Sequence, residues 1–294
     1  MAKKPYSILS FDNDAWWFHL KYVGAPEKEI EKARKKDVVL LDGIKNCLSE
    51  LEKSSLKATF FSIGSDVERY PEQHKAIAKE GHEIGSHSYT HPHPFSLSRE
   101  KFRDELIKTE AAIKRTTGVK VKGFRAPSYQ ISEAYLQVLG EMGYRYDTSV
   151  ISLFYPGYSS LKNAFLPRTI YHPSPTDMYR RGELRLTEFP ISGLPLLPLT
   201  GTVILNLGMP YFKAIFNILR LTNPVFVINF HIRDFIELPS YRLQSANRYS
   251  KTANYWGTSL KKKLAVIRPV FDYLSKHTRS ITYSDYLDAA GDAS

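Results

Sequence analysis

The ten residues HEIGSHSYTH, numbered 82–91, join a short strand-like run to two histidines that stand four positions apart. The first half ends in an apolar run typical of a buried strand, and the second half carries His87 and His91. On a helical turn, side chains four positions apart share a face, so both imidazoles would reach one cation. A metal site needs at least one further ligand from elsewhere in the chain.

The leading candidates for that ligand are Asp12 and Asp14, which follow the strand-like run Tyr6–Phe11. Two positions apart, they would lie on the same side of an extended chain, so that one binds metal while the other acts as a base. Two imidazoles, a carboxylate and a position left for water are typical of a catalytic rather than a structural zinc site. Each half alone has a plainer explanation, as a turn or as a polar surface pair, so further partners are needed.

Length and composition favour one large domain covering residues 1–294. The chain has 43% hydrophobic residues and no composition break, so it can bury a sizeable core. Its net charge of +11 suits an anionic partner such as a phosphorylated sugar or a lipid headgroup, although ordinary solubility also explains it. Nucleic acid is not expected as a partner, because no recognisable binding module accompanies the charge. The single cysteine, Cys47, excludes an internal disulfide framework and is expected in the core.

Strand-like and helix-like segments alternate along most of the chain. This rhythm predicts an α/β fold, either a parallel sheet or a barrel, with its chemistry at the carboxyl ends of the strands. The expected strands are 6–11, 58–63, 82–86, 121–124, 144–150, 186–191 and 224–230, and the expected helices are 38–51, 66–80, 98–118, 133–142, 211–221 and 260–274. The irregular stretch 151–185 is long enough to be a substrate-facing loop region.

Two further segments concern membranes and location. Residues 189–212 carry no charge, which by length would suggest a membrane span, but four prolines argue against a regular helix there. In the helix expected next, Lys213 and Arg220 flank apolar residues; it is either a core helix or an interfacial face that meets lipid, which makes 189–222 an apolar segment of interest. Residues 1–5 leave no room for a secretory signal before the first strand, so a cytoplasmic location is expected.

Five short motifs follow the predicted strands in order: FDND (11–14), HSYTH (87–91), RAPSY (125–129), YDTS (146–149) and NFH (229–231). Together they resemble the ordered motifs of the polysaccharide deacetylases, carbohydrate esterase family four. The resemblance covers about residues 6 to 285, and its strongest elements are the paired histidines and the FRAP sequence (124–127). The resemblance implies a distorted (β/α)7-type barrel.

The resemblance also implies a role for each motif residue. Asp14, His87 and His91 would bind a divalent metal, with zinc expected first, although cobalt and nickel accept the same donors. Asp12 would be the general base, and Arg125 would orient it and keep it ionised.

The remaining motifs would complete the reaction. A backbone N–H near Tyr129 would stabilise the oxyanion. His231 would protonate the leaving amine, and Asp147 would hold His231 and raise its pKa. Many family members have adjacent aspartates, whereas here Asn13 separates them, as in a branch that includes peptidoglycan-deacetylase-like proteins and deacetylases or deformylases of lipid-linked sugars.

The implied function is a metal-dependent N-deacetylase that removes an acetyl or similar small acyl group from an amino sugar in a glycan or a lipid-linked saccharide. Three basic residues, Arg180, Arg181 and Arg220, together with the apolar segment, would attract a polyprenyl-phosphate sugar at the inner face of a membrane. Two alternatives stay open: an amidohydrolase acting on a small ureide or cyclic imide, and a non-catalytic carbohydrate-binding protein. The intact set of acid, base and metal-ligand candidates argues against the second. A homo-oligomer is also left open.

Overall fold

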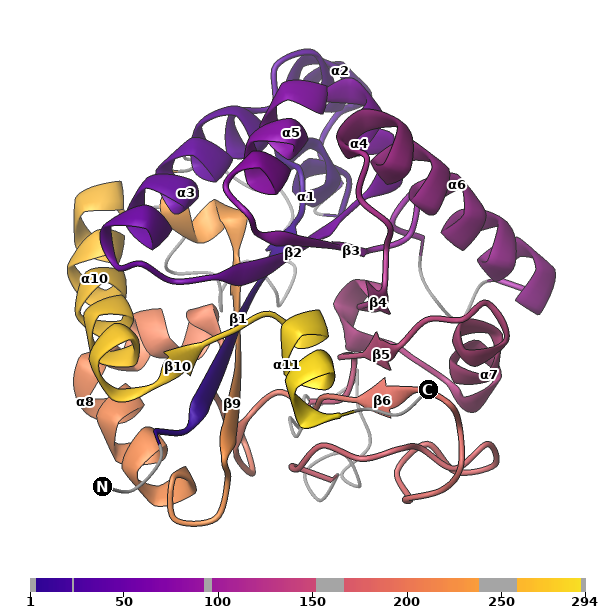
Figure 1. The fold of residues 1–294 in the computed structure, drawn as a ribbon. Coiled ribbons are helices and arrows are strands. Elements are labelled where there is room, and N and C mark those ends of the chain that lie inside the picture. Colours follow the sequence, from indigo (N-terminus) through magenta and orange to yellow (C-terminus); the bar gives the residue numbers. More distant parts are fainter. Residues whose placement is uncertain (1–3, 23, 93–96, 152–166, 238–257, 292–294) are drawn as a thin grey trace.

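A computed structural model describes residues 4–22, 24–92, 97–151, 167–237 and 258–291. Its centre is a parallel sheet in which β1 has β9 on one side and β2 on the other, with β3, β4, β5 and β6 following in order (Figure 1). The short β10 pairs with the start of β1. The strands are β1 (Tyr6–Asn13), β2 (Ala58–Ser62), β3 (Glu83–Ser86), β4 (Gly123–Phe124), β5 (Tyr146–Asp147), β6 (Thr187–Glu188), β9 (Val225–His231) and β10 (Arg279–Ser280).

The sheet curves into a distorted barrel, which confirms the predicted fold class. Every residue of β2, and every residue of β1 after Tyr6, is buried, as expected for parallel strands covered on both faces. Between β6 and β9 the chain makes single bridges instead of a full ladder: Thr200 pairs with Asn229, and the Ser192 N–H donates to the Val227 carbonyl at 2.9 Å. All these strands run the same way, so their carboxyl ends gather at one end of the barrel.

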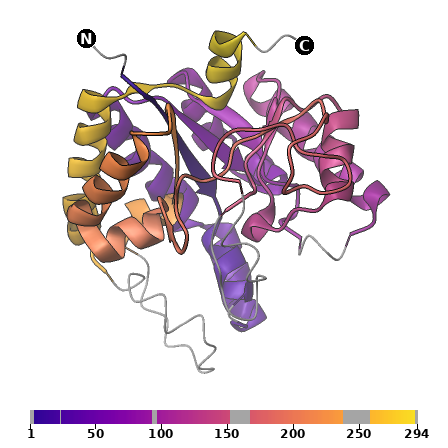
Figure 2. The same ribbon diagram turned by 90° about the horizontal axis from the view of Figure 1, so that it is seen from below.

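Helices surround the sheet (Figures 1 and 2). Local signals set several of their ends: Ser98 accepts a hydrogen bond from the Lys101 N–H at the start of α6, and Gly118, at φ +74°, ends it. The helices are α1 (Trp16–Tyr22), α2 (Glu27–Lys35), α3 (Ile44–Lys53), α4 (Gly64–Arg69), α5 (Pro71–Lys79), α6 (Arg99–Thr117), α7 (Glu133–Glu141), α8 (Gly201–Leu219), α10 (Leu260–His277) and α11 (Tyr283–Ala290). Both ends of α6 agree with the sequence prediction.

Elsewhere the elements differ from the prediction for identifiable reasons. The helix expected over 66–80 is two helices, because Pro71 lacks an N–H and begins α5 instead of continuing α4. A π-helical turn at Val39–Gly43 precedes α3 and rotates the buried face, so Val39 and Leu40 are buried while Leu41 is only partly so. Of the expected loop region 151–185, residues 152–166 lie outside the described residues, and the rest is turns and bridges.

The apolar segment contains a helix that the prolines did not prevent, which corrects the sequence prediction. Pro195 and Pro198 lie in the hairpin of β7 (Gly193–Leu194) and β8 (Leu197–Pro198), before α8 begins. Inside α8, Gly208 leaves helical geometry at φ +74°, and this kink accommodates Pro210. Among the described residues, α8 alone has the length and apolar composition to cross a membrane, and 28% of its most apolar stretch is buried.

Gly123 lies where the barrel interior leaves no space for a side chain. A Cβ at this position would lie 1.8 Å from the ring of Tyr146, which is fully buried. We therefore expect Gly123→Ala to lower the free energy of unfolding by about 1–3 kcal/mol, measured by urea denaturation. Gly140→Ala in α7 is the matched control, since nothing lies within 4 Å of its added Cβ, and it should be neutral or stabilising by up to about 1 kcal/mol. Equal destabilisation by both substitutions would contradict this account.

Candidate functional site

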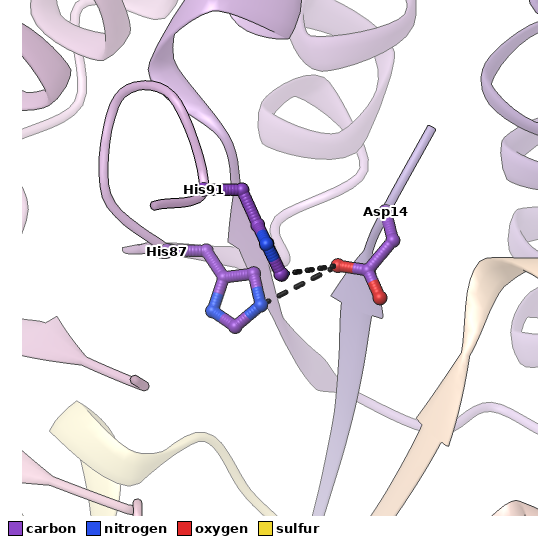
Figure 3. A group of neighbouring side chains, drawn as sticks. All are labelled: Asp14, His87 and His91. Carbon is purple, nitrogen blue, oxygen red and sulfur yellow. Dashed lines mark ion pairs between the residues drawn. The ribbon is translucent and has the colours of Figure 1, made fainter. Parts of the chain in front are cut away.

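The end of β1 and the loop after β3 bring one carboxylate and two imidazoles together (Figure 3). Asp14 Oδ1 lies 3.4 Å from His87 Nε2 and 3.8 Å from His91 Nε2, and all three residues are buried. One donor atom from each residue lies within 4.8 Å of the others. The two histidines are on a loop and not on a helical turn, which corrects the expected local geometry; positive φ angles at Ser88 and His91 turn the chain so that both rings face Asp14.

Glu105 of α6 holds this loop in place. Its carboxylate accepts hydrogen bonds from the backbone N–H groups of Tyr89 at 2.8 Å and Thr90 at 2.7 Å, and from the Thr90 hydroxyl at 3.0 Å. From the other side, the Gly64 N–H donates to the Ser88 carbonyl at 3.0 Å. This role could not be predicted from the sequence, because an acidic residue in an amphipathic helix ordinarily faces solvent.

The donors are arranged as a divalent metal would require. His87 Nδ1 lies 2.7 Å from the Arg125 carbonyl oxygen, which can only accept, so Nδ1 carries the proton and the lone pair of Nε2 faces Asp14. An outer hydrogen bond of this kind commonly fixes the tautomer of a metal-binding histidine. Asp14 Oδ1 is buried with no donor at normal hydrogen-bond geometry among the described residues, a costly state that a cation would relieve.

The charge states of Asp14 and His91 also fit a metal site. Burial raises the pKa of Asp14, but the facing His87 and His91 imidazoles outweigh it and hold that pKa well below its usual value. Burial lowers the pKa of His91 to about 4, so its imidazole is neutral at pH 7. Burial lowers the pKa of His87, but the facing Asp14 carboxylate outweighs it and raises that pKa above its usual value. Asp14 and His91 are therefore already in the ionised and neutral forms that bind divalent metals, whereas a protonated His87 would release its proton to a bound metal.

Arg125 is fully buried beside this cluster and binds the other aspartate. Its Nη1 donates to Asp12 Oδ1 at 2.7 Å and to Asn229 Oδ1 at 2.6 Å. The remaining donors reach a second residue of β1 and two other segments: the Ser10 and Tyr283 hydroxyls and both oxygens of Thr148. The Arg125 guanidinium, held by these partners, in turn fixes the position of the Asp12 carboxylate.

His231 faces the same carboxylate from the end of β9. Its Nε2 lies 3.5 Å from Asp12 Oδ2 and 3.9 Å from Asp14 Oδ2. Burial raises the pKa of Asp12, but the Arg125 and His231 charges together bring it below its usual value, so Asp12 is ionised at neutral pH. Burial, and then the nearby Arg233, lower the pKa of His231.

Asp147 does not hold His231, which corrects the role implied by the resemblance. Its carboxylate accepts hydrogen bonds from the Ser149 N–H at 3.0 Å and the Ser149 hydroxyl at 2.8 Å, and it lies beside Glu188 on the neighbouring strand β6. Because β5 pairs with β4 and β6, while β9 pairs with β1, the two residues belong to separate parts of the barrel. The group that fixes the backbone of His231 is Asp234, which accepts from its N–H at 2.9 Å.

Tyr129 is in the site, but with its side chain and not its backbone N–H. That N–H donates to the Ala126 carbonyl at 3.0 Å within a tight turn, so the expected oxyanion donor already has an acceptor. The phenol oxygen instead accepts from Asn229 Nδ2 at 2.5 Å. Both Ser128 and Tyr129 have positive φ angles, +56° and +57°, and this turn directs the ring toward the site.

Sequence reasoning missed two members of the site. Asn229 donates to Asp12 Oδ2 at 3.3 Å while its Oδ1 accepts from Arg125, so its amide connects base and guanidinium. Its signal was its place in the NFH motif, where only the histidine received a role. Arg233 Nη1 lies 3.5 Å from Asp14 Oδ2 and has no comparable sequence signal.

Asn13, between the two aspartates, is held by a buried histidine. Its Nδ2 lies 3.1 Å from His74 Nε2, and His74 Nδ1 lies 2.8 Å from the Tyr70 carbonyl oxygen. Since the carbonyl only accepts, Nδ1 carries the proton and Nε2 accepts from Asn13. This arrangement uses neutral His74, and burial lowers its pKa to about 4.

Comparison with known proteins points to one family. Residues 37–146 match the family model described as polysaccharide deacetylase, a range that includes His87, His91 and Arg125 but not Asp12, Asp14 or His231. A peptidoglycan deacetylase of Helicobacter pylori is 36% identical over 109 residues, 37% of this chain and 37% of that protein. A peptidoglycan-N-acetylglucosamine deacetylase of Bacillus cereus is 37% identical over 97 residues, 33% of this chain and 35% of that protein. The matched part thus spans little more than a third of these curated relatives.

The fold similarity extends further than the sequence similarity. A Mycobacterium smegmatis protein assigned to the polysaccharide deacetylases superposes with a TM-score of 0.66, covering 100% of this chain and 93% of that chain at 19% identity. At that identity the likeness concerns the fold alone.

The state of His74 predicts acid sensitivity. Its folded pKa of about 4 lies below the value of about 6.5 in an unfolded chain, so the unfolded state binds the proton first and stability falls as the pH drops from about 6.5 through about 4. His74→Gln keeps a donor and an acceptor but does not titrate. Between pH 7 and pH 5 the wild type should lose about 2 kcal/mol more free energy of unfolding than this variant, measured by urea denaturation. Parallel losses in the two proteins would show that His74 does not carry the effect.

Proposed function

This chain belongs to the polysaccharide deacetylase family, and on that premise we propose that it is a metal-dependent hydrolase that removes an acetyl or similar small acyl group from an amino sugar. Both curated relatives compared above are peptidoglycan deacetylases, which supports an N-acetylated glycan as the substrate class. The observation that carries the proposal is the convergence of Asp14, His87 and His91 beside the Asp12 carboxylate and the His231 imidazole.

Asp14, His87 and His91 are the residues that would hold the metal. We propose zinc, while cobalt or nickel would accept the same nitrogen and oxygen donors. When bound, such an ion would supply Lewis-acid polarisation of the scissile amide carbonyl.

Asp12 is the proposed general base. Because the Arg125 charge outweighs burial and keeps Asp12 ionised, this carboxylate is ready to accept a proton from the attacking water. Arg125 and Asn229 each bind one of its oxygens, which restricts rotation of the carboxylate. These two residues therefore act on the reaction through Asp12 as positioning residues.

His231 is the proposed acid for the leaving amine. Its lowered pKa leaves the imidazole neutral before reaction, so it must first gain a proton. His231 Nε2 lies 3.5 Å from Asp12 Oδ2, which gives the proton taken up by Asp12 a short path to the imidazole and from there to the amine nitrogen. The Tyr129 hydroxyl, next to Asn229, is placed to contact the substrate on the same side.

Finer parts of the proposal concern organisation and location. We propose that residues 1–294 act as a single catalytic domain, since one hydrophobic cluster contains buried residues from Leu9 to Leu274. We also propose a lipid-linked saccharide as substrate and a cytoplasmic location at the inner face of the membrane, supported by the net charge of +11 and by the apolar surface described below.

Two substitutions separate metal binding from base catalysis. We expect His87→Ala to lose both bound metal and activity, because it removes a ligand whose tautomer is fixed by Arg125. Asp12→Asn should keep the metal and lose about 10²-fold or more in kcat, since the amide cannot accept the proton. The measurements are elemental metal analysis and acetate release from N-acetylglucosamine oligomers. His277→Ala, at an exposed position on α10, is the control and should keep both properties.

The same preparation tests the alternatives. Turnover of cyclic imides or ureides, with no acetate released from N-acetylated sugars, would replace the deacetylase proposal by a small-molecule amidohydrolase. Glycan binding without any turnover in the metal-loaded wild type would replace it by a carbohydrate-binding protein.

A further inference from the structure

Exposed large hydrophobic side chains gather on one part of the molecule. Among the described residues six such side chains are exposed, and five of them lie within 196–221. These five are Leu196 (52% exposed), Leu197 (37%), Leu207 (52%), Ile218 (49%) and Leu221 (79%). The sixth, Ile107 on α6, is 51% exposed and lies outside this segment.

The outward side of α8 accounts for most of this surface. Its exposed residues at intervals of three or four are apolar: Leu207, Pro210, Ala214 and Ile218, followed by Leu221 just after the helix. The tip of the β7–β8 hairpin, Leu196 and Leu197, is tied to the helix by a hydrogen bond of 2.9 Å from the Tyr211 hydroxyl to the Pro198 carbonyl. We call these seven residues the apolar face.

The opposite side of α8 is already used for packing. Phe212, Phe216 and Leu219 are buried there, and Phe216 stacks on Phe226 of β9 at 4.1 Å. The helix also packs against α10, beside which it lies in Figure 1. A helix fixed along one side cannot leave the domain to cross a bilayer, but its outward side is free to lie in the plane of an interface.

The charges around the apolar face favour an anionic surface. From Phe189 to Arg233 the sequence contains no aspartate or glutamate, while Lys213 and Arg220 are exposed beside the apolar residues. A second copy of this chain would bring the same cations against its own, which is unfavourable. Of the three arginines singled out in the sequence, only Arg220 lies at α8, as its C-cap residue. Arg180 and Arg181 lie between β5 and β6, and Arg180 pairs there with Asp177 at 3.3 Å.

The N-terminal end of α8, the helix that carries most of the apolar face, lies close to the catalytic residues. A Cβ on Gly201, the first residue of α8, would lie 2.4 Å from Asp234 Oδ2, the oxygen that accepts from the His231 N–H. The N-terminal end of α8 therefore contacts the loop that carries the proposed acid. From this end the apolar face extends along α8 to Leu221, which precedes the amino end of β9.

We propose that the apolar face docks on a bilayer that contains anionic lipid, and that docking brings the site to an amino sugar carried on a lipid. The inserted groups are the leucines and Ile218, and the headgroups meet Lys213 and Arg220. The choice of substrate rests on the proposed function, whereas docking itself rests on the exposed apolar residues and on the charges of Lys213 and Arg220 beside them.

Vesicle co-sedimentation of the full chain tests the docking. The wild type should bind vesicles of phosphatidylcholine mixed with phosphatidylglycerol, and bind pure phosphatidylcholine far less. The double substitution L207S/I218S should weaken binding to the mixed vesicles about tenfold or more, since it removes two inserted side chains. Lys213→Gln and Arg220→Gln should each weaken it about fivefold. Ile107→Ser changes an equally exposed residue on α6 and should have no effect.

Three results would overturn the docking proposal. They are the absence of binding to the mixed vesicles, an equal loss with Ile107→Ser, and a change of oligomeric state with L207S/I218S in the absence of lipid, measured by sedimentation equilibrium. Acetate release from soluble N-acetylglucosamine oligomers is followed in parallel and should be the same for L207S/I218S and the wild type. Failure of acetate release in every protein, with vesicle binding intact, would overturn the deacetylase proposal and leave docking standing.

Discussion

A buried guanidinium is the constraint on which the rest of this structure depends. Arg125 has no exposed surface, and an unpaired cation at such a place would be strongly destabilising. Its partners come from β1, β9, the segment after β5 and the start of α11, so one charge is neutralised and hydrogen-bonded only when these parts have assembled. The ring of Phe61, 4.3 Å from the guanidinium carbon, covers one of its faces. Assembly of the barrel and completion of the polar centre are therefore a single event.

The same residue serves both halves of the site. Its side chain binds the Asp12 carboxylate, and its backbone carbonyl accepts a hydrogen bond from His87 Nδ1 at 2.7 Å. The base and one proposed metal ligand are thereby fixed to a single short strand end, with little freedom to move relative to each other. Asn229 and Tyr129 extend the network on the substrate side, so the site is pre-organised by hydrogen bonds that the fold itself requires.

The outer surface differs from the polar centre in that its main feature is an apolar helix, α8. Helix α8 is apolar on both sides, which a helix in contact only with water would not favour, because large exposed apolar patches usually mark a contact surface. One side is explained by packing on β9 and α10, and the other by the proposed lipid contact. Since α8 starts against Asp234, next to the backbone of His231, one end of the helix that carries the apolar face adjoins the loop of the proposed acid.

The sequence by itself determined the elements whose signals are local: the buried runs of β1, β2 and β9, the Ser98 and Gly118 ends of α6, and the placement of Asp12, His87 and Arg125 at strand ends. Tertiary structure alone decided which strand ends face one another, since that depends on sheet order and register between distant segments. For this reason Asp147 binds Ser149 and not His231. For the same reason Asn229 and Arg233 belong to the site, and Glu105 holds the loop of the two histidines, although no role was predicted for any of the three. The kink at Gly208 likewise allowed a helix where prolines argued against one, because a single residue at positive φ changes what the neighbouring chain can adopt.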